Sequence, residues 1–264
     1  MSLIDGYLTA AGHRLEAVWY GPPPDVAPTL VFLHEGLGCV SMWRDFPEKL
    51  AAATGCGALV YSRLGYGRSE QRPLPWPVTY MHDEGLRVLP DVLSAARVQD
   101  CILVGHSDGG SVALIYAGGT PSPSLRGVIT EAAHVFLEDE SVESVGAAKQ
   151  QYLHDGLKQR LARHHGENTD CAFFGWADSW LNPAFRDWNI EEYLAPISAP
   201  VLAIQGVDDR YGTQAQVDAV VGQVGGAAEA LMLPDCGHSP HREQEAATLT
   251  AMTRFIGRIL TSDG

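Results

Sequence analysis

The sequence predicts an α/β protein in which a mostly parallel, eight-stranded sheet is flanked by helices and carries a helical insertion. Short apolar runs that end in glycine or a polar residue alternate with longer segments of helical periodicity, which is typical of a parallel sheet covered by helices. From about residue 136 to residue 188, aromatic and charged residues at helical spacing interrupt this alternation. The 264 residues, of which 45% are hydrophobic, accommodate one core with such an insertion.

The predicted elements follow one another along the whole chain. Strands are expected at residues 15–20, 29–33, 58–61, 102–104, 127–130, 201–205 and 231–233, with a weaker one near residues 3–8. Helices are expected at residues 41–53, 82–96, 109–117, 214–221 and 243–260. Pro196 and Pro200 favour extended geometry before them and return the chain to a strand. We therefore divide the chain into a core domain, residues 1–133 and 190–264, and a cap, residues 134–189.

Charge and cysteine content narrow the possible partners. The chain has 18 Lys and Arg against 32 Asp and Glu, a net charge of −14, so nucleic acid is not an expected partner. Five scattered cysteines without a C-x-x-C pair indicate free thiols in a reducing compartment. No signal-like start or membrane-spanning apolar run is present. We expect a cytoplasmic monomer or homodimer that acts on a small molecule.

A candidate nucleophile stands in a strand-turn-helix context. Gly105-His106-Ser107-Asp108-Gly109 joins the predicted strand at residues 102–104 to the helix that follows. This G-x-S-x-G pattern places a serine on a strained turn above the sheet edge, where only glycine fits the close backbone approaches. Because a serine hydroxyl is a poor nucleophile, the chemistry also requires a base and an orienting acid.

Candidates for both groups follow later strands. The loop after residues 201–205 carries Asp208 and Asp209, and the loop after residues 231–233 carries His238. The carboxyl ends of parallel strands share one edge of a sheet, so these side chains are expected near Ser107. The chain order Ser, Asp, His is that of the α/β-hydrolases.

With these motifs, the chain resembles the α/β-hydrolase superfamily over almost its whole length. The likeness rests on the serine turn, on the two later loops, and on residues 33–38 and 63–69, which follow two earlier strands. The resemblance implies Ser107 as nucleophile, His238 as general base and acid, and Asp209 as the orienting acid. Asp208 is the alternative acid.

The resemblance also implies an oxyanion hole formed by the backbone N–H groups of Asp108 and Gly36, with Leu37 as a less favoured donor. Two residues depart from the family pattern. Glu35 stands where glycine is common, and Asp108 stands where an apolar or amide residue is common. Both would place a carboxylate near a developing anion. We therefore expect at least one to be paired with a cation such as Arg63 or Arg242.

Several further side chains are candidates for contact with substrate. They lie on the loops at the predicted sheet edge or in the cap: Glu35, Leu37, Trp43, His106, Trp176, Trp180 and His241. For His106 and His241, a structural role is the alternative. No cofactor is expected, because Gly36-x-Gly38 lacks the third small residue of a dinucleotide fingerprint. No metal is expected either, because His34-Glu35 lacks the second histidine of H-E-x-x-H.

The predicted reaction is a two-step acyl transfer to water, with a carboxylic ester as the first substrate class. Resembling enzymes use the same three residues to cleave a carbon-carbon bond in diketone-like products of aromatic catabolism. Peptidase, thioesterase and lactonase activities also stay open, whereas a serine nucleophile argues against dehalogenase and epoxide hydrolase chemistry. A non-catalytic small-molecule receptor is the alternative from another class.

Overall fold

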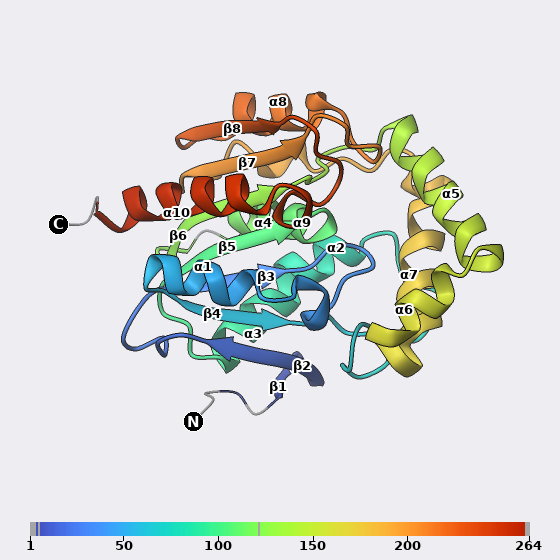
Figure 1. Ribbon diagram of the computed structural model, residues 1–264, viewed down its shortest axis with the longest axis horizontal. Coiled ribbons are helices and arrows are strands. Elements are labelled where there is room, and N and C mark those ends of the chain that lie inside the picture. Colours follow the sequence, from blue (N-terminus) through green and yellow to red (C-terminus); the bar gives the residue numbers. More distant parts are fainter. Residues whose placement is uncertain (1–3, 5, 121, 262–264) are drawn as a thin grey trace.

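The computed structural model describes residues 4, 6–120 and 122–261, and an eight-stranded sheet forms its centre (Figure 1). The strands are β1 (Tyr7–Ala10), β2 (His13–Tyr20), β3 (Thr29–Leu33), β4 (Gly57–Tyr61), β5 (Cys101–His106), β6 (Leu125–Glu131), β7 (Val201–Gly206) and β8 (Ala228–Leu233). They lie in the order β1-β2-β4-β3-β5-β6-β7-β8. The pairs β1/β2 and β2/β4 are antiparallel, and all other pairs are parallel. The predicted fold is thereby confirmed.

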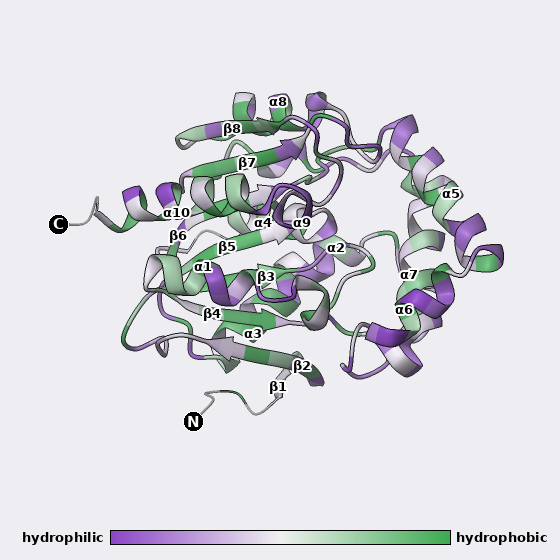
Figure 2. Cartoon of the chain, in the orientation of Figure 1, coloured by the Kyte–Doolittle hydropathy of each residue, from purple (hydrophilic) through white to green (hydrophobic). Residues whose placement is uncertain are grey.

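Helices cover both faces of this sheet because its central strands are apolar on both sides. Alternate residues of β3 enter two separate cores, with Leu30 and Phe32 in one and Val31 and Leu33 in the other. The first core is covered by α1 (Phe46–Thr54) and α10 (Glu245–Thr261), and the second by α3 (Leu89–Ala95), α4 (Asp108–Gly119) and α8 (Gln214–Gln223). Figure 2 shows the apolar residues concentrated on the central strands.

Two predicted helices are interrupted. The expected helix at residues 41–53 divides into a 3-10 turn, η1 (Val40–Trp43), and α1, because Arg44 takes a positive φ of 55° between them. The expected helix at residues 82–96 comprises α2 (Tyr80–Asp83), a π-helical turn η2 (Glu84–Val88) and α3. Most strands run a few residues beyond their predicted ends. The weak strand expected near residues 3–8 is β1, and residues 3 and 5 lie outside the described part.

The insertion between β6 and β7 forms a helical layer beside the sheet (Figure 1). Its elements are α5 (Asp139–His154), α6 (Leu157–His165), η3 (Gly166–Asn168), α7 (Thr169–Trp180) and η4 (Pro183–Phe185). Its two ends pair with each other, through an antiparallel bridge between Phe136 and Asn189 and a 2.7 Å bond from the Ile190 N–H to the Val135 carbonyl. The domain boundaries at residues 134 and 189 stay a prediction.

Two further short helical elements, η5 (Glu191–Tyr193) and α9 (Pro240–Glu243), lie in the described part of the chain. After the insertion comes η5, and α9 lies between β8 and α10. Glycine and threonine set the ends of neighbouring helices. Gly55 closes α1 in the left-handed conformation, φ 72°, and the Thr213 hydroxyl caps α8 by accepting from the Ala215 N–H at 3.2 Å. Within the described residues, no helix combines the length and apolarity of a membrane span.

The start of α4 packs against the end of β3 so closely that a side chain at Gly109 would overlap the backbone. A Cβ there would lie 2.0 Å from the Leu33 carbonyl oxygen. We therefore expect Gly109→Ala to lower the free energy of unfolding by about 3 kcal/mol or more. The matched control is Gly257→Ala in α10, where a Cβ meets no atom within 4 Å. That change should raise stability by about 0.5 to 1 kcal/mol. Urea unfolding of both variants tests this, and equal effects would contradict it.

Candidate active site

Ser107 stands at the tip of the turn between β5 and α4 in a backbone conformation that few residues adopt. Its φ is 52° and its ψ is −119°. The turn is held because the Ser107 N–H donates to the Glu131 carbonyl at 2.8 Å, and the Gly110 and Ser111 N–H groups donate back to the Ser107 carbonyl at 2.8 and 3.0 Å. A strained conformation fixed by its surroundings is characteristic of functional turns.

The three residues predicted to meet at the sheet edge do meet there. The Ser107 Oγ lies 2.9 Å from the His238 Nε2, and both carboxylate oxygens of Asp209 lie 2.9 Å from the His238 Nδ1. Because a carboxylate only accepts hydrogen bonds, Nδ1 carries the proton and Nε2 is free to accept from the serine hydroxyl. The arrangement is a continuous relay of hydroxyl, imidazole and carboxylate.

Asp209, rather than Asp208, is the residue in contact with His238. Its side chain is buried and also accepts from the Tyr211 N–H at 2.8 Å and from the Gln205 Nε2 at 3.3 Å. Burial alone would raise the pKa of Asp209, but His238 and the Tyr211 N–H lower it below its ordinary value. Asp208 is exposed on the same loop.

Backbone donors are available beside Ser107. Within the described part of the chain, the N–H groups of Gly36, Leu37 and Asp108 donate to no protein acceptor. Asp108 begins α4, where the first N–H groups have no partner inside the helix. Gly36 and Leu37 lie in the loop after β3 that lines the cavity above Ser107. A substrate oxygen that gains negative charge beside Ser107 could therefore accept hydrogen bonds from two sides, from Asp108 on one and from Gly36 or Leu37 on the other.

Both carboxylates that depart from the family pattern have cationic neighbours. The Asp108 side chain, fully buried, lies 4.0 Å from the Arg63 Nη2 and accepts a short hydrogen bond from the Tyr80 hydroxyl. Burial raises the pKa of Asp108 despite these two partners. The Glu35 carboxylate lies 3.4 Å from the His106 Nδ1. Arg242 takes part in neither pair, so the expected cation is Arg63 for Asp108 and a histidine for Glu35.

His106 and His241 form a buried layer beneath the His238 loop. The His106 Nε2 donates to the His238 carbonyl at 2.6 Å, while its Nδ1 faces Glu35. Burial disfavours a charged imidazole, yet the Glu35 carboxylate raises the pKa of His106 to about 9. The His241 Nδ1 lies 2.9 Å from the carboxylate of Glu131, which is itself buried.

This layer corrects part of the sequence prediction. Trp43 is buried with its ring 4.6 Å from that of His241, and neither residue lines the cavity above Ser107. His106 does not line it either. Trp43 at the end of η1, His106 at the end of β5 and His241 in α9 are all buried and pack beneath the loops rather than over the sheet edge. His106 and His241 are buried and bonded to other protein groups, as expected for the structural role that was the alternative to contact with substrate.

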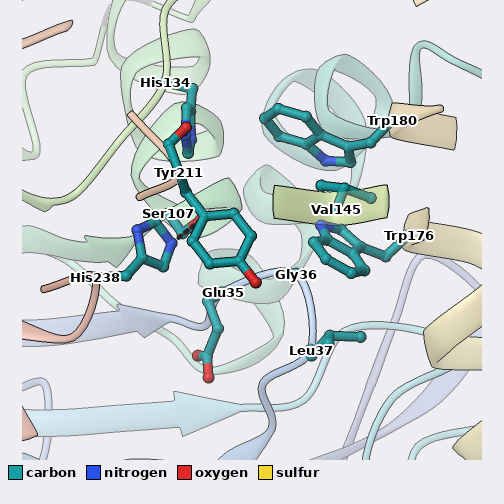
Figure 3. Close-up of a pocket in the computed structure, with 10 residues that line it drawn as sticks. All are labelled: Glu35, Gly36, Leu37, Ser107, His134, Val145, Trp176, Trp180, Tyr211 and His238. Carbon is teal, nitrogen blue, oxygen red and sulfur yellow. Dashed lines mark hydrogen bonds between the residues drawn. The ribbon is translucent and has the colours of Figure 1, made fainter. Parts of the chain in front are cut away.

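A cavity of about 90 Å³ opens above Ser107 (Figure 3). The predicted Glu35, Leu37, Trp176 and Trp180 all line it. The full lining is Glu35, Gly36, Leu37, Ser107, His134, Val145, Trp176, Trp180, Tyr211 and His238. Figure 3 shows the two indoles and Val145 on one wall, facing His134, Tyr211, Ser107 and His238 on the other. The Glu35 carboxylate points away from Ser107. The cavity is therefore chiefly apolar and aromatic.

His134 and Tyr211 line the cavity but were not predicted from the sequence. The His134 Nε2 donates to the Tyr211 carbonyl at 3.0 Å, and burial with nearby His238 lowers the pKa of His134 to about 4. The Tyr211 ring packs 4.6 Å from the His238 ring. Both residues follow the carboxyl ends of strands, β6 and β7. The rule that located the acid and the base would have found them.

The insertion is bound to the rest of the chain by a buried histidine of helix α6. His165 is buried, and its Nε2 donates to the Leu37 carbonyl at 2.9 Å while its Nδ1 accepts from the Gly67 N–H at 3.0 Å. Burial lowers the pKa of His165, as this neutral tautomer requires. Among residues 4, 6–120 and 122–261, no group of three His, Cys, Asp or Glu side chains is arranged to hold a metal ion.

The His106–Glu35 pair makes a testable contribution to stability. Folding raises the pKa of His106 from 6.5 to about 9, so the folded protein holds this proton more tightly than the unfolded chain. The stabilisation is complete below about pH 6.5 and is lost as the pH rises through about 9. We expect the free energy of unfolding to fall more steeply across this range in the wild type than in His106→Gln. Urea titrations at several pH values measure both slopes, and equal slopes would contradict the pairing.

Comparisons with known proteins agree with the fold. A model of the alpha/beta hydrolase family matches residues 30–251. An sn-1-specific diacylglycerol lipase of Danio rerio is 31% identical over 127 residues, 48% of this chain and 38% of that protein. A 2-succinyl-6-hydroxy-2,4-cyclohexadiene-1-carboxylate synthase of Escherichia fergusonii is 25% identical over 261 residues, 87% of this chain and 94% of that protein. A thermophilic esterase from Thermogutta terrifontis is similar in structure, with a TM-score of 0.74, 16% identity, and coverage of 96% of this chain and 98% of that one. The chain belongs to the alpha/beta hydrolase family.

Proposed function

We propose that this protein is a serine hydrolase that cleaves a small carboxylic ester through an acyl-enzyme on Ser107. The observation that carries the proposal is the relay of 2.9 Å contacts from the Ser107 Oγ through His238 to Asp209. A neutral imidazole with its proton on the acid-facing nitrogen is the form that can remove a proton from serine. The relay opens directly into the cavity, where substrate binds.

In the first step, the Ser107 Oγ attacks the carbonyl carbon while His238 Nε2 takes the hydroxyl proton. The carbonyl oxygen becomes an oxyanion, which accepts hydrogen bonds from the N–H groups of Gly36 and Asp108. When the tetrahedral intermediate collapses, the ester C–O bond breaks and His238 passes its proton to the leaving alcohol. Asp209 stabilises the imidazolium that exists between these two transfers.

In the second step, water takes the place of the departed alcohol. His238 removes a proton from the water as its oxygen attacks the acyl carbon, and the oxyanion forms again at the same donors. Collapse breaks the bond to Ser107, and His238 returns the proton to its Oγ. The carboxylic acid leaves, and the enzyme regains its starting state.

The cavity favours an ester with a small, uncharged acyl group. At about 90 Å³ it is smaller than the ~150 Å³ that holds benzene in an engineered lysozyme cavity. Its walls are largely indole, phenol and aliphatic surface, and the described residues that form them include no Lys or Arg for a substrate carboxylate. Short acyl chains would therefore be preferred, with the alcohol part extending toward the opening.

A fluorophosphonate probe tests whether Ser107 is an activated nucleophile. We expect stoichiometric labelling of the wild-type protein and none of Ser107→Ala, because the probe reacts only with a serine that a base activates. Ser111→Ala is a matched control, since this buried serine four residues on bonds the His134 carbonyl at 2.6 Å instead. Absence of labelling in folded wild-type protein would favour a small-molecule receptor.

Exchange of the two neighbouring acids tests the relay. Asp209→Asn should lower kcat for p-nitrophenyl esters by about 10⁴-fold, because the amide favours the wrong tautomer of His238. Asp208→Asn, the control on the same loop, should change kcat by less than about twofold, because surface substitutions rarely matter. The reverse pattern would reassign the acid to Asp208.

A panel of p-nitrophenyl acetate, butyrate and octanoate, with a ring-fission diketone alongside, ranks the acyl classes. Turnover of the diketone alone would overturn the ester assignment.

A further inference from the structure

The peptide unit between Glu35 and Gly36 is held by three donors on its carbonyl side. The Glu35 carbonyl oxygen accepts from the His34 Nδ1 at 2.7 Å, from the Arg63 Nη2 at 3.0 Å and from the Gly38 N–H of the same loop at 3.0 Å. The N–H of the same planar unit belongs to Gly36 and has no protein acceptor in the described part of the chain. Donors on the carbonyl fix the rotation of the whole unit, because the peptide is planar, and two of the three come from side chains outside the loop turn. They also polarise its N–H and strengthen it as a donor.

Arg63 is built into this position from its own backbone outward. Its side chain is 4% exposed, and its guanidinium carbon lies 5.0 Å over the ring of Tyr66. Its backbone N–H donates to the His34 Nε2 at 3.0 Å, which leaves the proton on the nitrogen that bonds the Glu35 carbonyl. Arg63 therefore supplies one of the two side-chain donors and sets the tautomer of His34, which is the other.

Asp108 connects Arg63 to the wall of the cavity. Its carboxylate lies 4.0 Å from the Arg63 Nη2 and accepts from the Tyr80 hydroxyl, which accepts in turn from the Trp180 Nε1 at 2.9 Å. All four side chains are buried, and Trp180 belongs to helix α7 of the insertion and lines the cavity. A chain of polar contacts thus runs from the cap to the Glu35–Gly36 peptide.

We propose that Arg63 and Asp108 are positioning residues that hold the Glu35–Gly36 peptide with its N–H directed at the substrate oxyanion, and that Tyr80 couples this peptide to Trp180 of the cap. The inference rests on the proposed serine mechanism. This role explains why a carboxylate lies beside the oxyanion site. Asp108 holds the Arg63 guanidinium in place, and the positive charge of the guanidinium balances that of the carboxylate. Loss of either partner should leave ground-state binding intact and weaken only the transition state.

Steady-state kinetics of the full chain with p-nitrophenyl acetate tests the proposal. Arg63→Gln should lower kcat by about 10- to 100-fold and change KM by less than about threefold. The reason is that the Gly36 N–H, which Arg63 positions, donates to the oxyanion only in the transition state. Asp108→Asn should lower kcat by about tenfold, because the guanidinium loses its anchor. The double variant should match Arg63→Gln within about twofold, because Asp108 acts through Arg63. Arg72→Gln is the control, since this neighbouring arginine lies over Trp76 instead.

A boronic acid separates positioning from a general structural role. Butylboronic acid forms a tetrahedral anion on the nucleophile, so its affinity should fall in Arg63→Gln by the same factor as kcat/KM. Tyr80→Phe, a milder change, should lower kcat by about three- to tenfold with KM preserved, and it carries the test if Arg63→Gln does not fold. Parallel losses in kcat and in boronate affinity support the proposal. Unchanged kcat, faster turnover in Asp108→Asn, or additive losses in the double variant would overturn it.

Fluorophosphonate labelling distinguishes this failure from failure of the serine mechanism. If the wild type and the variants are labelled but their kcat values are equal, the positioning role is wrong and the hydrolase assignment stands. If the wild type itself is not labelled, the proposed mechanism falls, and the inference falls with it.

Discussion

The site depends on a backbone contact with no side chain between its partners. Strand β3 ends where helix α4 begins, and the Cα of Gly109 approaches the Leu33 carbonyl so closely that a Cβ would stand 2.0 Å from it. Two residues before this contact, Ser107 takes a positive φ, in a turn held by its bond to the Glu131 carbonyl. The contact also brings the loop after β3, which carries Gly36, beside the N-terminus of α4. One steric requirement thus sets the distance between the nucleophile and both proposed oxyanion donors.

Buried charge then holds the loops around this contact. On one side, His106 lies between the Glu35 carboxylate and the His238 carbonyl, so it joins the loop after β3 to the loop that carries the base. On the other side, Arg63 lies between the Glu35 carbonyl and the Asp108 carboxylate and joins the same loop to helix α4. Charges removed from water are costly unless they are paired. These pairs therefore oppose independent movement of the loop after β3, the His238 loop and the start of helix α4.

The sequence predicted the order of the elements because each strand is a short apolar run closed by glycine or a polar residue. It also predicted the proximity of Ser107, Asp209 and His238, since all three follow strand ends at one edge. It could not separate residues that line the cavity from those that pack beneath it. Trp43 and His241 resemble pocket residues in type and position, but their direction depends on tertiary packing. The sequence indicated Arg63 as a cation for one of the two carboxylates, and it lies beside Asp108. Its bond to the Glu35 carbonyl could not be predicted, because a backbone acceptor leaves no mark in the sequence.

The two ends of the helical insertion lie side by side, at the bridge between Phe136 and Asn189 and the bond from Ile190 to Val135. Since its entry and exit points are adjacent, its length and helix packing can change in evolution without altering the spacing of the strands below. Strand ends and loops of the sheet hold the proposed reacting groups, whereas Val145, Trp176 and Trp180 of the insertion shape one wall of the cavity. The proposed reacting groups and this wall of the cavity are therefore encoded in separate stretches of the sequence. Substitutions in the insertion can change the wall while the reacting groups stay the same.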